Sequence, residues 1–244
     1  MLADLSAQTL AVVVLGGFLG GVASGAAGFA YGVVATSIWL HAISPIHAAL
    51  LVVSGGLINQ MGLVWTMRRT LDFGRLWPFL IGGAIGVPLG VALVVETNPR
   101  AIRVALAIFM VVYGIYALAA PRLPRIAWGG RTADAGVGFL GGLFGGVAGL
   151  SGIFPAVWTQ LRGWPKEAAR GVYQPFILLA HLLTLLLIGA LALDRTGVVL
   201  FLVAIPAILL GSWTGWLIYG RLNERRFQQM LSLLLIVSGL LLIF

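Results

Sequence analysis

The stretch GGFLGGVASGAAGFAYG, residues 16–32, holds seven glycines among seventeen residues and no charged residue. It lies inside an apolar run that extends from residue 9 to residue 40. Each glycine costs about 1 kcal/mol relative to alanine in a helix interior. A plain membrane-spanning helix gains nothing from so many glycines, so the stretch needs another explanation.

The composition is that of a polytopic membrane protein. Of the 244 residues, 60% are hydrophobic and 9% are charged, whereas soluble domains carry about 25% charged residues. With 0 cysteines, disulfides and thiolate metal sites are excluded, and we expect no cofactor or metal. The net charge of +8 comes from basic residues in short loops, which are topology signals in membrane proteins, so we expect no nucleic-acid partner.

Two of the apolar runs have an unusual length. At about 1.5 Å per residue, a helix over residues 9–40 would be roughly 48 Å long, too long for one crossing of a core about 30 Å thick and too short for two. We therefore expect each glycine-rich run to form two half-length helices, joined near the bilayer centre, with both ends on the same side. The candidate spans are residues 9–40, 47–67, 76–95, 102–120, 135–160, 171–193, 196–220 and 227–244.

The loop charges favour this hairpin arrangement. If both glycine-rich runs return to the side where they began, 12 of the 15 Lys and Arg residues fall on one side, and only Arg100, Arg103 and Arg195 fall on the other. If each run crosses once, the split is 7 to 8. The positive-inside rule prefers the first arrangement, with both termini outside the cytoplasm. Two short full crossings per run would give the same split, so that alternative stays open.

The second half of the chain repeats features of the first. GGVASGAAG (Gly20 to Gly28) matches GGLFGGVAG (Gly141 to Gly149), and GVPLG (86–90) matches GSWTG (211–215). We predict a first repeat over 1–120, a cytoplasmic linker over 121–134 and a second repeat over 135–244. Each repeat holds a glycine-broken helical hairpin, or two short spans, plus three transmembrane helices. Because three is odd, the repeats are inverted, as in secondary transporters whose broken helices form the substrate site.

Polar residues inside the predicted spans are candidates for the site, because hydrocarbon offers them no partner. Ser54 and Gln174 occupy equivalent places in the two repeats, and His181 could relay a proton. Arg170 could attract an anion at the cytoplasmic mouth or serve as a topology anchor. The predicted substrate-binding residues are Ser24, Gly25, Gly28, Ser54, Asn59, Gln60, Gly149, Ser151, Gly152, Tyr173, Gln174 and His181.

The acidic residues narrow the substrate class. All seven acids lie at or beyond the ends of the predicted spans, so no carboxylate is left to bind a cation in the membrane. Backbone N–H groups at the N-termini of half-helices, amides and hydroxyls suit a carboxylate or a sulfonate. We therefore expect a small anionic substrate.

The segments GFLGGVASGAAGF (17–29) and GFLGGLFGGVAGLSG (138–152) are each followed by a proline-containing turn and an alanine pair, at 48–49 and 168–169. With these features the chain resembles the sulfite exporter TauE/SafE family. The resemblance implies a multi-pass protein of the bacterial inner membrane. It also implies transport of small anions such as sulfite, sulfoacetate, other organosulfonates or related carboxylates.

The sequence leaves three functions open. The first is a secondary transporter, an exporter of small anions that works by alternating access. The second is an anion channel or passive permease of the same fold. The third, an intramembrane enzyme, has few participants for acid–base or metal chemistry, so we predict that the protein is not an enzyme. The sequence leaves open whether the protein acts as a homodimer.

Overall fold

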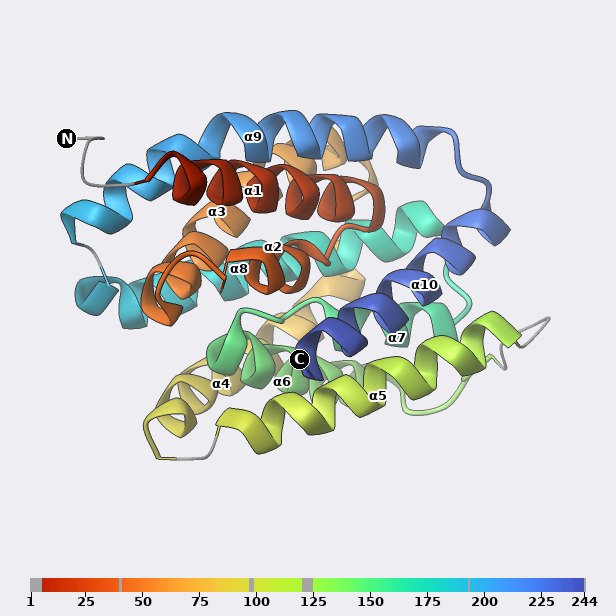
Figure 1. The fold of residues 1–244 in the computed structure, drawn as a ribbon. Helices are drawn as coiled ribbons and strands as arrows, with labels where there is room; N and C mark the ends of the chain where they lie inside the picture. The colour runs from red at the N-terminus through yellow and green to blue at the C-terminus, as the bar shows by residue number, and fades with distance from the viewer. Residues whose placement is uncertain (1–5, 40, 97–98, 120–124, 193, 244) are drawn as a thin grey trace.

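The computed structural model describes residues 6–39, 41–96, 99–119, 125–192 and 194–243, and all regular structure within them is helical (Figure 1). The prediction of an all-α protein is confirmed for this part of the chain. The helices are α1 (Ala7–Ala27), α2 (Tyr31–Trp39), α3 (Pro45–Thr66), a short 3₁₀ turn η1 (Arg68–Thr70), α4 (Phe73–Glu96), α5 (Pro99–Ala119), α6 (Gly130–Ala148), α7 (Ile153–Leu161), α8 (Lys166–Ala192), α9 (Arg195–Gly220) and α10 (Glu224–Ile243).

Both glycine-rich runs are interrupted, but the two pieces of each run are unequal. The helices α1 and α6 have 21 and 19 residues, and each is followed by a helix of nine residues, α2 or α7. The expectation of two half-length helices per run differs from this result. The reason is that Gly28 and Gly149, which end the long helices, lie near the C-terminal end of each glycine-rich stretch.

Each short helix folds back along the long helix before it. The indole N–H of Trp39, at the end of α2, donates to the Val13 carbonyl near the start of α1 at 3.0 Å. The indole N–H of Trp158 in α7 donates to the Asp134 carboxylate near the start of α6 at 2.7 Å. Nine helical residues extend roughly 14 Å, so neither short helix can cross a hydrocarbon core of about 30 Å.

The helix lengths agree with a multi-pass membrane protein. Four helical segments of the described chain are long and apolar enough to cross a membrane, namely Ala7–Ala27, Phe73–Leu93, Lys166–Leu187 and Arg195–Gly220. Shorter apolar stretches, Leu50–Thr66 and Ala107–Ala119, lie in α3 and α5.

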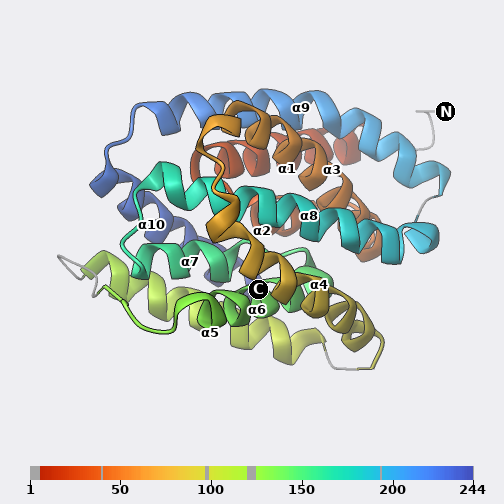
Figure 2. The same cartoon turned by 180° about the vertical axis from the view of Figure 1, so that it is seen from behind.

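Glycines let the long helices pack closely in the same way in both halves. α1 lies against α9, and α6 lies against α4, in both views of the molecule (Figures 1 and 2). A Cβ atom on Gly21 of α1 would stand 3.0 Å from the backbone nitrogen of Ser212 in α9, and one on Gly142 of α6 would stand 3.0 Å from that of Val87 in α4. These backbones approach too closely for a side chain between them, as in small-residue helix contacts in membranes. The matched glycines at 86, 90, 211 and 215 serve this packing.

Two further pairs join the halves. α5 packs on α10, where a Cβ on Gly114 would lie 2.8 Å from the Ser232 carbonyl and one on Gly239 would lie 2.8 Å from the Ala107 carbonyl. α3 packs on α8, and α8 lies between the α1–α9 pair and the α4–α6 pair (Figures 1 and 2). The side chains that α8 carries toward the two interruptions are therefore at the centre of the protein.

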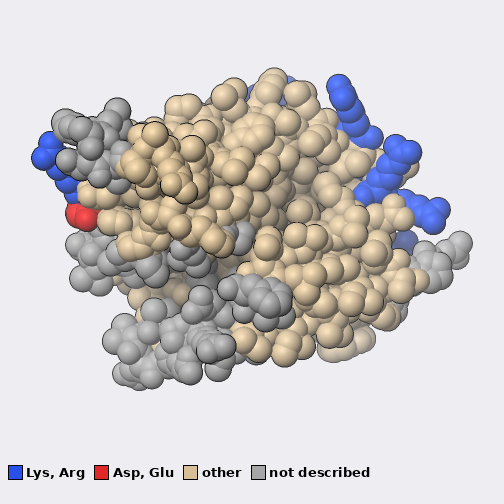
Figure 3. Space-filling view, in the orientation of Figure 1, with Lys and Arg blue, Asp and Glu red and all other residues tan. Residues whose placement is uncertain are grey.

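The basic side chains gather at one end of the molecule. Most of the Lys and Arg atoms visible in Figure 3 lie at the end where α9 finishes and α10 begins, and few lie at the opposite end. Basic side chains also stack on aromatic rings, including Arg68 on Trp65 and Arg75 on Trp164. Arg122 lies outside the described residues, as do the side chains of Arg100 and Arg103.

Candidate functional site

The two interruptions begin at glycines with left-handed backbones. Gly28 (φ 91°) follows α1 and Gly149 (φ 69°) follows α6, and the N–H of each bonds back to a carbonyl in the last turn of its helix. Only glycine adopts this conformation without a steric penalty. The two glycines are 121 positions apart in the sequence, at 28 and 149.

The two interruptions touch each other. A Cβ on Gly152, just before α7, would lie 2.5 Å from the Cβ of Phe29, just after Gly28. A Cβ on Gly32 would lie 3.4 Å from the Gly149 carbonyl oxygen. The breaks therefore cross at backbone contact, which agrees with the prediction that they meet.

Arg170 closes the end of α1. Its side chain is 0% exposed and donates to the carbonyls of Gly25 at 3.0 Å and Ala26 at 2.9 Å. The guanidinium also lies over the ring of Tyr219, 4.0 Å from its centroid. The last carbonyls of a helix have no partner within the helix and carry its negative dipole end, so a cation is favourable here. Arg170, for which the sequence left open an anion-attracting role or a role as topology anchor, lies buried against the end of α1.

Two other side chains complete this closure. The Tyr173 hydroxyl donates to the Ala27 carbonyl at 2.6 Å, and the Gln60 amide nitrogen donates to the Gly28 carbonyl at 2.9 Å. With Arg170, they give every carbonyl from 25 to 28 a donor from α3 or α8.

The end of α6 has a different environment. The His181 imidazole, through Nε2, lies 3.3 Å from the Gly149 carbonyl oxygen. Where the Tyr173 ring covers Gly28, the apolar side chain of Val52 covers Gly149, 2.7 Å from the place of a Cβ. Val52 and Tyr173 are themselves 121 positions apart, so the same places around the two glycines carry different chemistry.

Several buried polar atoms around the interruptions have no hydrogen-bond partner. Their side chains are at most 3% exposed. Buried polar atoms in native proteins are nearly always satisfied, so a group of unsatisfied ones needs a reason such as a ligand. Among them are the hydroxyls of Ser24 and Ser151, Nδ2 of Asn59, Oε1 of Gln60, both amide atoms of Gln174, and Nδ1 of His181. We refer to these six residues as the central polar cluster.

Gln174 is the member of the central polar cluster with two unpartnered polar atoms. It is 0% exposed, and neither its oxygen nor its nitrogen has a partner. Its nitrogen lies 3.0 Å from the place where a Cβ of Gly28 would stand, directly beside the first interruption. A buried amide with both ends free is costly unless something else bonds to it.

Some predicted residues have local roles. The Ser54 hydroxyl donates to the Leu50 carbonyl of its own helix at 2.5 Å, and Gly25 packs against α9. The Asn59 oxygen accepts from Ser212 of α9. The structure thus places Ser54 and Gly25 in helix packing, and it gathers Gln60, Gln174 and His181 beside the two breaks.

The sequence reasoning missed the network that holds α7. Asp134, expected at or beyond the end of its span, is only 6% exposed and accepts from Trp158 and from Arg162, at 2.7 and 3.3 Å. The Tyr113 hydroxyl of α5 donates to the Gln160 oxygen at 2.9 Å. A charge next to a glycine-rich run is an ambiguous signal, since it can mark a helix end or a buried pair.

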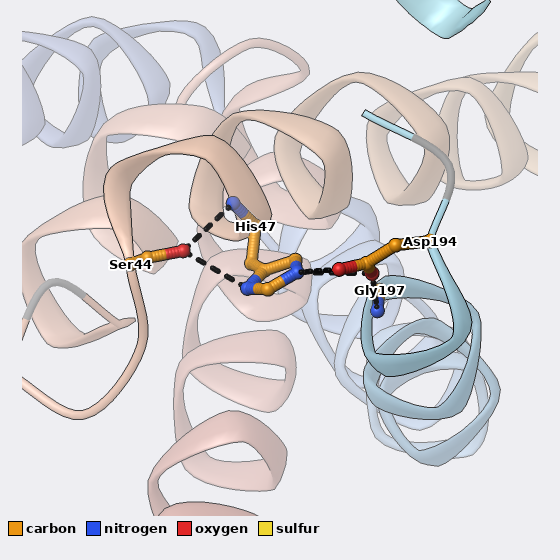
Figure 4. A network of polar contacts seen from close by, with 4 residues as sticks. All are labelled: Ser44, His47, Asp194 and Gly197. Carbon is orange, nitrogen blue, oxygen red and sulfur yellow. Dashed lines mark hydrogen bonds and ion pairs between the residues drawn. The ribbon is translucent and has the colours of Figure 1, made fainter. Parts of the chain in front are cut away.

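A polar network joins the halves at the opposite end of the molecule (Figure 4). Nε2 of His47 donates to the Asp194 carboxylate at 3.0 Å, and Nδ1 lies 2.9 Å from the Ser44 hydroxyl. Asp194 caps α9 by accepting from the Gly197 N–H at 2.6 Å. The Gly197 N–H and the His47 ring hold the pKa of Asp194 below its usual value.

A family model described as sulfite exporter TauE/SafE matches residues 13–242, nearly the whole chain. The match spans both interruptions and every residue of the central polar cluster. No curated protein and no solved structure matches the chain.

Proposed function

The chain belongs to the sulfite exporter TauE/SafE family, and from that premise we propose that it is a secondary transporter of small anions. The proposed substrates are sulfite and organosulfonates such as sulfoacetate, moved without chemical conversion. The proposed physiological direction is export.

The observation that carries this proposal is the contact between the two interruptions, with the central polar cluster around it. Phe29 meets Gly152 at the crossing, and unpartnered hydroxyl and amide groups lie beside it. Sulfite and sulfonates present oxygen acceptors, which the hydroxyls of Ser24 and Ser151 and the amide of Gln174 can satisfy. Broken helices that meet within the membrane form such sites in secondary transporters.

We propose that the two halves are inverted-topology repeats that move against each other. Each half has the order long helix, short helix and three further helices, and the long helices α1 and α6 pair with α9 and α4 in the corresponding way. The basic end of the molecule would face the cytoplasm, by the positive-inside rule. Both chain ends would then lie on the other side of the bacterial inner membrane.

Uptake into proteoliposomes tests the proposal. Purified protein is reconstituted, and entry of radiolabelled sulfite and sulfoacetate is followed in the wild type and in Gln174→Leu. Loss of the amide removes hydrogen bonds to the anion, so uptake should fall about tenfold or more. Ser238→Ala is the matched control, because Ser238 is also buried and unpartnered but lies in α10. If a folded Gln174→Leu protein takes up the anions as fast as wild type, the central polar cluster does not bind the transported anion.

A channel of the same fold is the alternative, and the burial of the central polar cluster supports a carrier over it. Side chains that line an open pore contact water, whereas these are at most 3% exposed. Electrical recording distinguishes the two, since a carrier turns over far too slowly for single-molecule currents. Discrete current steps in sulfite from reconstituted protein would establish the channel.

A further inference from the structure

Gln60 and His181 occupy equivalent positions in the two halves. Gln60 donates through Nε2 to the carbonyl of Gly28, and His181 lies with Nε2 against the carbonyl of Gly149. Both glycines end a long helix in the left-handed conformation. The separation between 60 and 181 is 121 positions, the same as between 28 and 149. The carbonyl of Gly28 is therefore bonded by a neutral amide, and the corresponding carbonyl of Gly149 by an imidazole.

Gln60 and His181 each have a second polar atom that does not face the glycine carbonyl, and in both residues this atom is a hydrogen-bond acceptor. A carbonyl oxygen only accepts, so the atom facing it must be an N–H: the amide nitrogen of Gln60 and a protonated Nε2 of His181. Oε1 of Gln60 and Nδ1 of His181 remain, and both are buried without a hydrogen bond of normal geometry; the backbone of Gly56 lies beside the imidazole. In neutral histidine Nδ1 is an acceptor, so the two leftover atoms repel an anion.

We propose that Nδ1 of His181 is a proton-binding site of the transport cycle, and that a proton and the anion occupy the central polar cluster together. This inference rests on the proposed transport function. A proton converts Nδ1 from an acceptor into a charged donor, which an anion can accept from. The end of α6 also favours a cation by its dipole, as the end of α1 does for Arg170.

No described charged group is bonded to His181. From α3 the facing residue is Gly56, whose Cβ would lie 2.7 Å from Nδ1 and Cε1; from α2 it is Tyr31, whose hydroxyl donates to the Leu51 carbonyl. On its own helix, Arg170 and Tyr173 are bound to the end of α1. The charged groups described on the other elements packed on α8 are engaged elsewhere or exposed: Arg68 and Arg69 of η1, Arg75 of α4, Arg131 and Asp134 of α6.

Burial explains why proton and anion would be coupled. An imidazolium alone in this cluster would lack a counter-ion, and an anion alone would face the unpartnered acceptors of Gln60 and His181. The two together are neutral for a monoanion, so the cluster gains no net charge when both bind. Proton and anion then move in the same direction. Export proceeds when the anion gradient outward exceeds the opposing proton gradient.

Binding as a function of pH tests this inference. Isethionate is the probe, because its sulfonate remains ionised throughout, so any pH dependence belongs to the protein. In detergent-solubilised wild type, isethionate affinity should fall about tenfold for each pH unit above the pH at which His181 loses its proton. His181→Gln introduces the residue type found at position 60 in the first half. This variant should bind isethionate weakly, and its affinity should not change with pH. His41→Gln, which changes an exposed histidine, is the matched control and should keep the wild-type pH dependence.

Transport separates this inference from the proposed function. Wild-type proteoliposomes should exchange labelled isethionate for unlabelled at equal pH, and they should accumulate it when the outside is more acidic. If the protein exchanges isethionate but neither accumulates it nor binds it in a pH-dependent way, the proton site is wrong. The proposed transport function would still be supported. Failure of both exchange and binding with isethionate, sulfite and sulfoacetate would overturn the two together. If His181→Gln does not fold, Gln60→His serves instead: a second imidazole should steepen the pH slope, and an unchanged slope contradicts the proposal.

Discussion

The ends of α1 and α6 have the same backbone and different chemistry. Gly28 and Gly149 turn the chain in the same left-handed way, and the two interruptions touch. At the end of α1, Arg170 and its neighbours give every terminal carbonyl a donor. At the end of α6, the donor from a described side chain is His181, and Val52 takes the place of Tyr173. The comparison indicates that the first break is held by a permanent charge and the second by a group that can gain or lose one.

Replacing Arg170 should have the largest effect on this comparison. Arg170→Met keeps the packing of the side-chain stem but leaves the carbonyls of Gly25 and Ala26 without their donor. Each buried acceptor left unsatisfied costs about 1–3 kcal/mol. Thermal unfolding in detergent should shift down by roughly 2–4 °C for each kcal/mol lost.

An exposed arginine provides the control for this change. Arg69→Met, in the 3₁₀ turn η1, removes the same charge from a solvent-exposed position and should leave the unfolding temperature nearly unchanged. If Arg170→Met and Arg69→Met unfold at the same temperature, the buried guanidinium does not stabilise the first break.

Alanine at the two left-handed glycines should have the next largest effects, and these should be unequal. Both substitutions place a side chain in the left-handed region, at about 1–2 kcal/mol. In Gly28→Ala the new Cβ also meets the Tyr173 ring, which is fixed by its bond to Ala27 and cannot move aside. In Gly149→Ala it meets one methyl group of Val52. Gly28→Ala should therefore unfold at a lower temperature, and equal unfolding temperatures would contradict the difference between the breaks.

The smallest effect is expected where the halves meet at the other end, at His47 and Asp194 (Figure 4). The folded state lowers the pKa of Asp194, so its carboxylate contributes stability above the unfolded value of about 3.9 and loses it as pH falls below that value. Asp194→Asn keeps the capping oxygen but not the charge. The variant should unfold slightly below wild type at pH 7, and the difference should shrink as the pH falls below about 3.9. A difference that does not change with pH would place the effect in something other than ionisation.

The equivalence of Gln60 and His181 was within reach of the sequence. Gly28 and Gly149 define a register of 121 positions, and extending it to the next helix aligns these two residues directly. Pairing Ser54 with Gln174 requires an offset of 120 positions instead, and the Ser54 hydroxyl bonds within its own helix. Glycine-rich apolar sequences can be aligned at several neighbouring offsets, whereas equivalent contacts in the structure fix a single offset.

The target of Arg170 could not be predicted in the same way. Its partners, Gly25 and Ala26, precede it by more than 140 positions and offer only backbone carbonyls. Backbone acceptors leave no trace in the sequence, because every residue carries one. The burial of Asp134 was equally hidden, since it depends on where Trp158 and Arg162 return.

The sequence by itself determined the membrane class, the family, the two glycine interruptions and the asymmetry of charge, because hydropathy, glycine spacing and loop charge are properties of local stretches. Only the tertiary structure decided which side chains meet the ends of the long helices, and which polar atoms remain without a partner. Those outcomes depend on the unsatisfied carbonyls of one segment being brought to the donors of another, and that distance in space is set by the packing of all the helices together.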